Sequence, residues 1–261
     1  MKISQLPIST LNTATDYIPI IKSNIYGTYS SYKMKSLSLG NIEDIATNSV
    51  VKLGNGSGSS FRIHNNNNSS GSYSGVLSGV NNTASGYASV VMGGSNNVAS
   101  GSYSTISGGS GSLADKYGQC ALSSGYFNTN GDAQTSMFVS RNQTNNTTET
   151  ELFLDGISQR INIANNTAWA FEVDIISTTY LSSTNSAGYN IKGIISNLGG
   201  NTSISQIPLK TTTQDVSTWD ANVEANNTYK ALVVKVTGDS NIIYWVACVQ
   251  LVEVTVPTTV P

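Results

Sequence analysis

Carboxylates are the first residues of this sequence that could do chemistry, because two of them held at a defined separation can hydrolyse a glycosidic bond. The candidates are Asp155, Glu172, Asp174 and Asp220. They are scattered along the chain, and only Glu172 and Asp174 are two residues apart, where a strand places both side chains on one face. That face is opposite to the apolar face of the same stretch, so we expect two solvated surface carboxylates. The sequence therefore predicts no catalytic residue and no enzyme.

Nucleophilic and metal chemistry find equally little support. His64 is the single histidine and lies in "RIHNNNN", so neither a Ser/His/Asp arrangement nor a transition-metal site is indicated. The repeats described below lack the aspartates of calcium-binding β-rolls. Cys120 and Cys248 fall in segments that we assign to different domains, so we expect two unpaired thiols, as suits assembly in a reducing cytoplasm. No metal and no cofactor are predicted.

The composition excludes several classes of partner. Only 11% of residues are charged and the formal net charge is −2, which gives no electrostatic basis for binding nucleic acid. No window approaches 18 consecutive apolar residues, and the N-terminus carries no signal-peptide pattern, so no membrane insertion is expected. Frequent aromatic and β-branched residues argue against disorder. These features predict a β-rich protein with a polar but uncharged surface.

A 15-residue phrase repeats in the first half of the chain and dictates its architecture. It reads "GSYSGVLSGVNNTAS" from Gly71, "GYASVVMGGSNNVAS" from Gly86 and "GSYSTISGGSGSLAD" from Gly101. Each copy predicts two short strands and two turns, with the Asn-Asn pairs at a corner that tolerates left-handed backbone geometry. A fourth, irregular copy follows after a one-residue slip. The predicted inward rows are Val76, Val91, Ile106 and Leu122, together with Ala84, Ala99 and Ala114.

So thin an apolar lining does not offset the entropy lost when 15 residues become ordered. Stacking of the coils recovers part of this deficit. We expect three chains packed around an axis to supply the rest, which predicts a homotrimer.

The remaining segments complete the predicted organisation. Residues 1–50 contain a hairpin signal, "DYIPIIK" and "TYSSYKMKS" around a turn, with too little apolar material for an independent core. Residues 51–70 are rich in Gly, Ser and Asn and are predicted to be a linker, and residues 71–131 form the roll. Residues 132–261 contain long alternating runs that predict an antiparallel β-sandwich.

Two runs define the predicted sandwich core or interface. In "AWAFEVDII" the apolar face consists of Trp169, Phe171, Val173 and Ile175. In the last strand Trp245 and Val249 share one face, but the other face is apolar as well. This strand is therefore either central and covered on both sides or part of a subunit interface.

The repeats "GYASVVMGGSNNVASGSYSTISGG" resemble the head repeats of trimeric adhesins of the YadA type. The resemblance implies a left-handed parallel β-roll, three of which form a head. The period of 15 departs from the commoner 14 of that family, and the secretion signal and membrane anchor of its bacterial members are not seen.

The rest of the chain points to bacteriophages. The runs "GDAQTSMFVSRNQTNNTTETELFLDG", "TAWAFEVDI" and "ALVVKVTGDSNIIYWVACVQLVEV" resemble the C-terminal domain of phage tail fibre proteins, and "KISQLP…TATDYIPI" is similar to segments that attach fibres to the virion. Together these resemblances imply a homotrimeric virion fibre, assembled in the bacterial host cytoplasm. It would contact other virion proteins through residues 1–50 and a host-surface glycan or protein through its distal domains.

Tail and capsid attachment stay open, so a head fibre or decoration protein is an alternative. A polysaccharide-degrading tailspike enzyme is the alternative from another class.

Aromatic residues leave the receptor-binding surface undecided. The tyrosines Tyr73, Tyr87, Tyr103, Tyr117 and Tyr126 recur through the repeats. They either shield surfaces between coils or chains, or form a ladder on which sugars stack.

Overall fold

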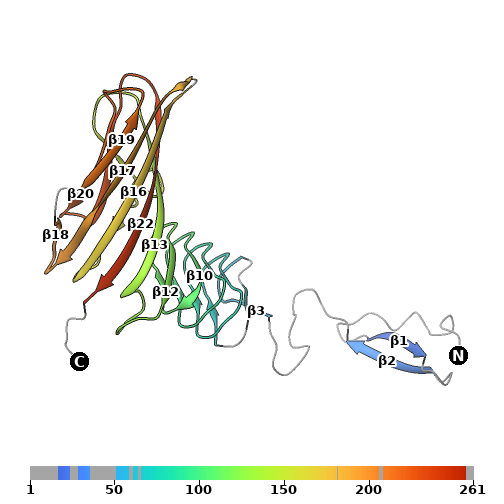
Figure 1. Cartoon of the computed structure of the whole chain (residues 1–261). Coiled ribbons are helices and arrows are strands. Elements are labelled where there is room, and N and C mark those ends of the chain that lie inside the picture. Colours follow the sequence, from blue (N-terminus) through green and yellow to red (C-terminus); the bar gives the residue numbers. More distant parts are fainter. Residues whose placement is uncertain are drawn as a thin grey trace. The chain divides into compact units, whose positions relative to one another are not determined.

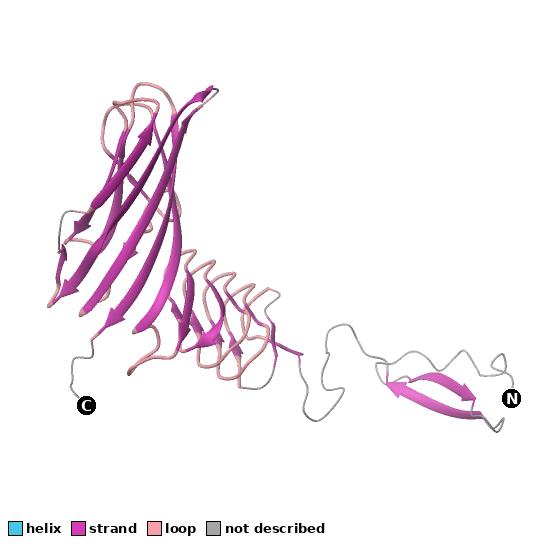
Figure 2. Ribbon diagram, in the orientation of Figure 1, coloured by secondary structure: helices cyan, strands magenta, loops and turns pink. Residues whose placement is uncertain are grey.

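The computed structural model describes residues 17–23, 29–35, 51–58, 61–63, 66–180, 182–205 and 208–256. They fall into two compact units, Met1–Ser49 and Val50–Pro261. The described residues form strands and no helix, which confirms the all-β fold class (Figure 2). The described residues contain no helix that is long and apolar enough to cross a membrane.

The first unit contains a hairpin. Strands β1 (Tyr17–Ser23) and β2 (Tyr29–Lys35) pair antiparallel, with Tyr17 opposite Lys35 and Ser23 opposite Tyr29. These are the two strands that the alternating sequence predicts.

The second unit begins with a parallel solenoid of about four coils (Figure 1). One ladder joins the equivalent strands of successive coils in parallel, namely β4 (Phe61–Ile63), β6 (Gly75–Val76), β8 (Val90–Val91), β10 (Thr105–Ser110) and β12 (Cys120–Ser124). A second ladder joins β5 (Asn68–Ser69), β7 (Thr83–Ala84), β9 (Val98–Ala99) and β11 (Leu113–Ala114). Each coil therefore contributes one short strand to each of two facing sheets.

Close backbone approach explains the glycines that open each copy. A Cβ built on Gly86 would lie 2.1 Å from the carbonyl oxygen of Gly101 in the next coil, and one on Gly71 would meet Gly86 in the same way. Gly94 has a φ of 86° as well, and its Cβ would lie 2.0 Å from the oxygen of Gly109. These rows accept only glycine, because any side chain would push the coils apart.

A buried asparagine ladder connects the coils beside the row of Gly79 and Gly94. Asn82 is fully buried; its Oδ1 accepts a hydrogen bond from the N–H of Asn97 (3.0 Å), and its Nδ2 donates to the carbonyls of Ser78 (3.2 Å) and Gly94 (2.9 Å). The preceding Asn81 and Asn96 adopt positive φ angles of 58° and 54°. Each "NN" pair thus supplies one left-handed corner residue and one internal bridge, as asparagine allows.

The solenoid has a core of its own within one chain. Six predicted inward residues have no exposed surface, and the cluster they form also contains Ala121; they are Val76, Ala84, Val91, Ala99, Ile106 and Ala114. The prediction for Leu122 is wrong, because Ala121 pairs with Ile106 and faces inward while Leu122 is 46% exposed. The fourth copy keeps the period of 15 at this position, because Ala121 follows Ile106 by 15 residues and the register shifts only after that pair. The expected slip of one residue therefore placed Leu122 on the wrong face.

The predicted linker is part of the solenoid. Strands β4 and β5 lie within residues 51–70 and extend both ladders by one coil, and β3 (Val51–Leu53) pairs with β4. Their sequence lacks the repeated phrase, but "NNNNSS" still supplies Asn67, which accepts the N–H of Asn82 at 2.9 Å. The solenoid therefore begins upstream of residue 71.

A single twelve-stranded sheet runs from the solenoid into the C-terminal half (Figure 1). The last solenoid strand, β12, pairs antiparallel with β13 (Ala133–Thr144), and the order continues through β22 (Ile243–Thr255), β16 (Thr167–Thr179), β17 (Ser182–Leu198) and β18 (Asn201–Ile204), with β19 (Leu209–Gln214) also on β17. Solenoid and C-terminal half belong to one compact unit, because a shared hydrogen-bonded ladder joins them.

A four-stranded sheet covers one face of the long strands. It consists of β14 (Thr150–Leu152), β15 (Ile161–Asn162), β20 (Asp220–Asn226) and β21 (Ala231–Thr237). Its buried side chains, including Leu152 and Val234, share one core with those of the large sheet. The predicted core residues Trp169, Phe171, Val173, Ile175, Trp245 and Val249 all lie in this cluster and are at most 4% exposed. The hydrophobic alternation of these strands thus marks the inner face correctly.

Side-chain amides close the open end of the second solenoid ladder. Gln134 of β13 accepts the N–H of Leu113 (2.9 Å) and donates to its carbonyl (3.0 Å), as a further strand would. Buried Gln119 donates to Ser136 Oγ at 2.9 Å. The C-terminal half therefore supplies the cap that the end of a solenoid requires.

Candidate binding surfaces

The outer face of the twelve-stranded sheet, the face turned away from the four-stranded sheet, is unusually apolar. Solvated faces of antiparallel sheets normally carry polar residues. Here the side chains that alternate with the buried ones are large, apolar and 39 to 64% exposed; they are Leu77, Met92, Leu122, Met137, Val139, Ile176, Ile194, Val246, Val252 and Val254. Eight of them lie on strands of this one sheet, and Leu77 and Met92 directly follow its strands β6 and β8, so this outer face continues from the solenoid into the C-terminal half.

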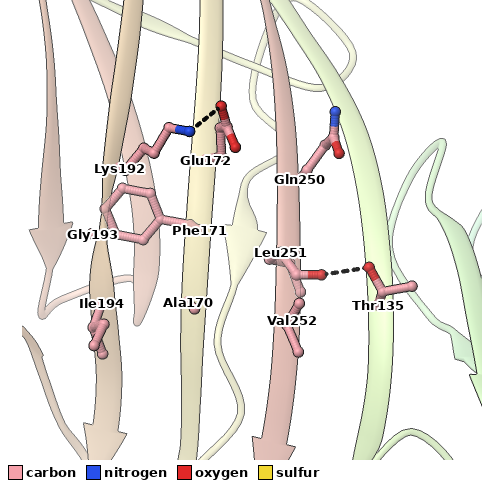
Figure 3. A pocket seen from close by; sticks show the side chains of 10 residues that line it. All are labelled: Thr135, Ala170, Phe171, Glu172, Lys192, Gly193, Ile194, Gln250, Leu251 and Val252. Atoms are coloured by element: carbon pink, nitrogen blue, oxygen red, sulfur yellow. Dashed lines mark hydrogen bonds and ion pairs between the residues drawn. The ribbon is translucent and has the colours of Figure 1, made fainter. Parts of the chain in front are cut away.

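The cross-strand register divides the outer face into bands. Val252 lies between Thr135 and Ala170, with Ile194 next in the row, whereas Gln250, Glu172 and Lys192 form the adjacent polar row. Figure 3 shows the shallow hollow between these rows, where Lys192 binds Glu172 at 2.8 Å. The two charged side chains of the row, Glu172 and Lys192, are therefore paired with each other within the face.

The carboxylates nominated by the sequence separate into different environments. Glu172 and Asp174 come together on the outer face, where Asn190 Nδ2 donates to both at 2.8 and 2.6 Å. Lys192 and then Asn190 lower the pKa of Glu172, whereas the general acid of a glycosidase needs a raised pKa.

The other two carboxylates have structural partners. Asp155 accepts the backbone N–H groups of Ile157, Ser158 and Gln159, and these bonds outweigh burial and lower its pKa to about 2. Asp220 forms an ion pair with Lys210.

The remaining candidates for chemistry are isolated. Within the described ranges, no group of three or more His, Cys, Asp or Glu side chains could hold a metal ion. Cys120 and Cys248 are free thiols that are partly exposed on the outer face, and burial raises the pKa of Cys248. His64 lies outside the described residues.

A row of tyrosines lines the solenoid edge at the turn that leads into the first ladder. Tyr73, Tyr87, Tyr103 and Tyr117 contact one another edge to face, with ring centroids 5.6, 5.4 and 5.3 Å apart. The first three are about half exposed, and Tyr117 packs against the main core. Of the five recurring tyrosines the structure brings these four together, whereas Tyr126 lies elsewhere, over Gly111.

The tyrosine row depends on an alternation in the repeats, in which tyrosine stands at the third or at the second position of successive coils. The third residue of each coil has a positive φ whatever its type: 60° at Tyr73, 51° at Ala88, 59° at Tyr103 and 63° at Gly118. Tyrosine occupies this position in two coils and the preceding position in the other two. The rings are thereby staggered, so that neighbours about 4.8 Å apart along the solenoid meet edge to face.

Comparison with known proteins yields distant structural likenesses. No protein-family model matches the sequence, and no curated protein does. Among solved structures, the tailspike protein of Acinetobacter baumannii phage AM24 is similar at a TM-score of 0.28 and 10% identity, covering 66% of this chain and 34% of that one.

Two further structures are similar at TM-scores of 0.25. They are tailspike gp49 of Acinetobacter baumannii bacteriophage Fri1, described as a capsular polysaccharide depolymerase (7% identity), and the tailspike of Acinetobacter phage vB_ApiP_P1 (12% identity). Each match covers 73% of this chain, which spans 40 and 41% of those two chains.

Proposed function

We propose that the protein is a homotrimeric fibre protein of a bacteriophage virion, structural and adhesive rather than enzymatic. Residues 1–50 attach it to other virion proteins, and the β-roll and the β-sandwich of residues 132–261 are displayed toward a host-surface glycan or protein. The sequence resemblances give this proposal its biological context. The exposed apolar outer face is the observation that carries it, because that face needs a partner.

The cost of leaving the outer face in water supports self-assembly. Roughly ten large apolar side chains are about half exposed, and covering half of such a side chain contributes about 1 kcal/mol. Contiguous surfaces of this kind on soluble chains mark protein interfaces. Sister copies fit this face, because Glu172 is already paired with Lys192 within it and the Asn190 amide binds the remaining carboxylate, Asp174.

The arrangement of carboxylates favours adhesion over catalysis. Glu172 and Asp174 share one amide donor, and Lys192 holds Glu172 in its charged form. Tail and capsid attachment are both compatible with this proposal, and immunogold labelling of virions with an antibody against the chain distinguishes them.

Light scattering on the purified full chain tests the assembly. We expect a particle of three chains. Val252→Asp should give monomers, because Val252 is 64% exposed in one chain but would bury a carboxylate between chains. Ile157→Asp, a matched control at a loop residue that is 78% exposed, should stay trimeric. A monomeric wild type, or a Val252→Asp variant that assembles with wild-type stability, contradicts the proposal.

A further inference from the structure

We infer that the tyrosine row Tyr73–Tyr87–Tyr103–Tyr117 is a glycan-binding site that takes a linear chain of pyranose sugars along the solenoid axis. The inference names the receptor site and receptor class within the proposed function, on which it rests.

Backbone strain is the first argument for a binding role. The third position of each coil has a left-handed φ, which glycine adopts without strain and which costs a bulky side chain on the order of 1 kcal/mol. Gly58 and Gly118 show that glycine serves this turn at the ends of the row. Tyr73 and Tyr103 therefore occupy a strained position where the turn itself requires no side chain.

Continuity of the row is the second argument. Where tyrosine is absent from the third position, in the coils of Ala88 and Gly118, it stands at the second as Tyr87 or Tyr117. One ring per coil is thus kept across four coils, and each contacts the next. If each tyrosine only shielded the turn of its own coil, the row would not need to be unbroken. A ligand that spans several coils does need an unbroken row.

The chemistry of the row selects the ligand class. Tyrosine rings offer apolar faces to the C–H groups of a sugar ring and hydroxyls to its oxygens, and within the described residues none of the four hydroxyls forms a hydrogen bond. Ser72 and Ser102 adjoin Tyr73 and Tyr103 and add further hydroxyls. Among the residues that the structure describes, the ion pair beside the row joins Lys116 to Asp115 and is internally neutral. An uncharged face of this composition suits a neutral polymer.

Periodicity favours a polysaccharide over a peptide. The binding groups recur once per coil, about 4.8 Å apart along the axis, which is close to the length that one linked pyranose adds to a sugar chain. The ring centroids lie 5.3 to 5.6 Å apart because the rings are staggered. Each ring is steeply inclined to the next, at 76, 76 and 64°, so consecutive sugars meet differently oriented rings. A repeating polymer can satisfy every step of such a row, whereas a peptide with varied side chains cannot.

Binding to defined sugars tests the inference on the full chain. The probes are cello- and chito-oligosaccharides of two to eight residues and a panel of immobilised bacterial O-chains and capsular polysaccharides, measured by calorimetry and surface plasmon resonance. We expect at least one probe to bind, with an affinity that rises with chain length and levels off near four sugars.

Variants assign the binding to the row. Tyr87→Ala removes a central ring and both of its ring contacts, so affinity should fall at least tenfold, whereas Tyr87→Phe should stay within about threefold. Tyr126→Ala, a matched control at an exposed tyrosine outside the row, should bind as wild type.

Particle mass is measured on every sample to separate this inference from the proposed function. A trimer that binds none of the probes, or that binds them equally well after Tyr87→Ala, overturns the glycan site and leaves the fibre intact. If Tyr87→Ala dissociates the trimer, the row is a subunit contact and the inference is wrong. A monomeric wild type that binds sugar through Tyr87 refutes the fibre but supports the site.

Discussion

Replacing Asn82 tests the buried asparagine ladder, on which the stacking of the coils depends. The side chain is fully buried and makes three hydrogen bonds, one accepted from Asn97 and two donated to the carbonyls of Ser78 and Gly94. Each buried backbone group that loses its partner costs about 1 to 3 kcal/mol. Asn82→Ala leaves three such groups without their partner and should therefore lower the free energy of unfolding by at least about 3 kcal/mol.

The isosteric Asn82→Asp separates hydrogen bonding from packing. Its carboxylate can still accept the N–H of Asn97, but it places negative oxygen against two carbonyls in a buried site. We expect it to be less stable than Asn82→Ala at neutral pH. Asn81→Gly is the control, because Asn81 is exposed and its φ of 58° suits glycine; it should stay within about 0.5 kcal/mol of wild type.

Urea denaturation followed by circular dichroism gives the free energies, and hydrogen exchange measured by mass spectrometry shows whether the amides of Asn97 and Ser112 open first. The reasoning is refuted if Asn82→Ala is within 0.5 kcal/mol of wild type, or if Asn82→Asp proves the more stable of the two variants.

Three more predictions concern other parts of the second unit. Gly94→Ala should lower the stability of the fold by at least about 3 kcal/mol, because its Cβ would lie 2.0 Å from a backbone oxygen. Gly118→Ala should lower it by about 1 kcal/mol, because Gly118 has a positive φ but open space around it. Thermal unfolding of the two variants measures both losses. Burial raises the pKa of Glu253, so the folded state binds its proton more tightly than the unfolded chain and wild-type stability should fall as pH rises through the folded-state pKa. Glu253→Gln should then be more stable than wild type at pH 7, and the two proteins should be equally stable near pH 4. Urea denaturation across that range measures the difference in stability between them, and a difference that does not change with pH would contradict the prediction. Arg160 binds Glu151 through two nitrogens at 2.7 and 2.9 Å and lies over the Tyr229 ring, so Arg160→Lys should cost about 1 kcal/mol in urea unfolding, and an unchanged midpoint would count against the pairing.

Regular repetition and alternation made much of this fold predictable. The rows of Val76, Val91 and Ile106 stand at fixed spacing, and "AWAFEVDII" alternates without interruption, so their buried faces follow from period alone. The same period places Glu172 and Asp174 on one solvated face, where the structure finds them.

Prediction failed in the irregular coils at the two ends of the solenoid. In the fourth copy a larger residue, Leu122, looked like the branched core position, but the period of 15 from Ile106 leads to the smaller Ala121, which β12 turns inward. The coil of Asn67 was missed because "FRIH" interrupts the Gly- and Ser-rich phrase there, although Asn67 precedes Asn82 by 15 residues and bonds to it through its side chain. The continuous outer face was also beyond reach, because it arises from the pairing of β12 with β13, a contact that no local pattern specifies.

The uniform joints between coils have a consequence for how such a molecule can change in length. The coil from Gly86 to Ser100 meets its neighbours through the same glycine contact, asparagine bridge and paired strands on both sides. Duplicating these 15 residues would restore every joint and extend the solenoid by about 4.8 Å, whereas inserting 14 or 16 would misalign all of them. The solenoid can thus be lengthened only by whole coils of 15 residues.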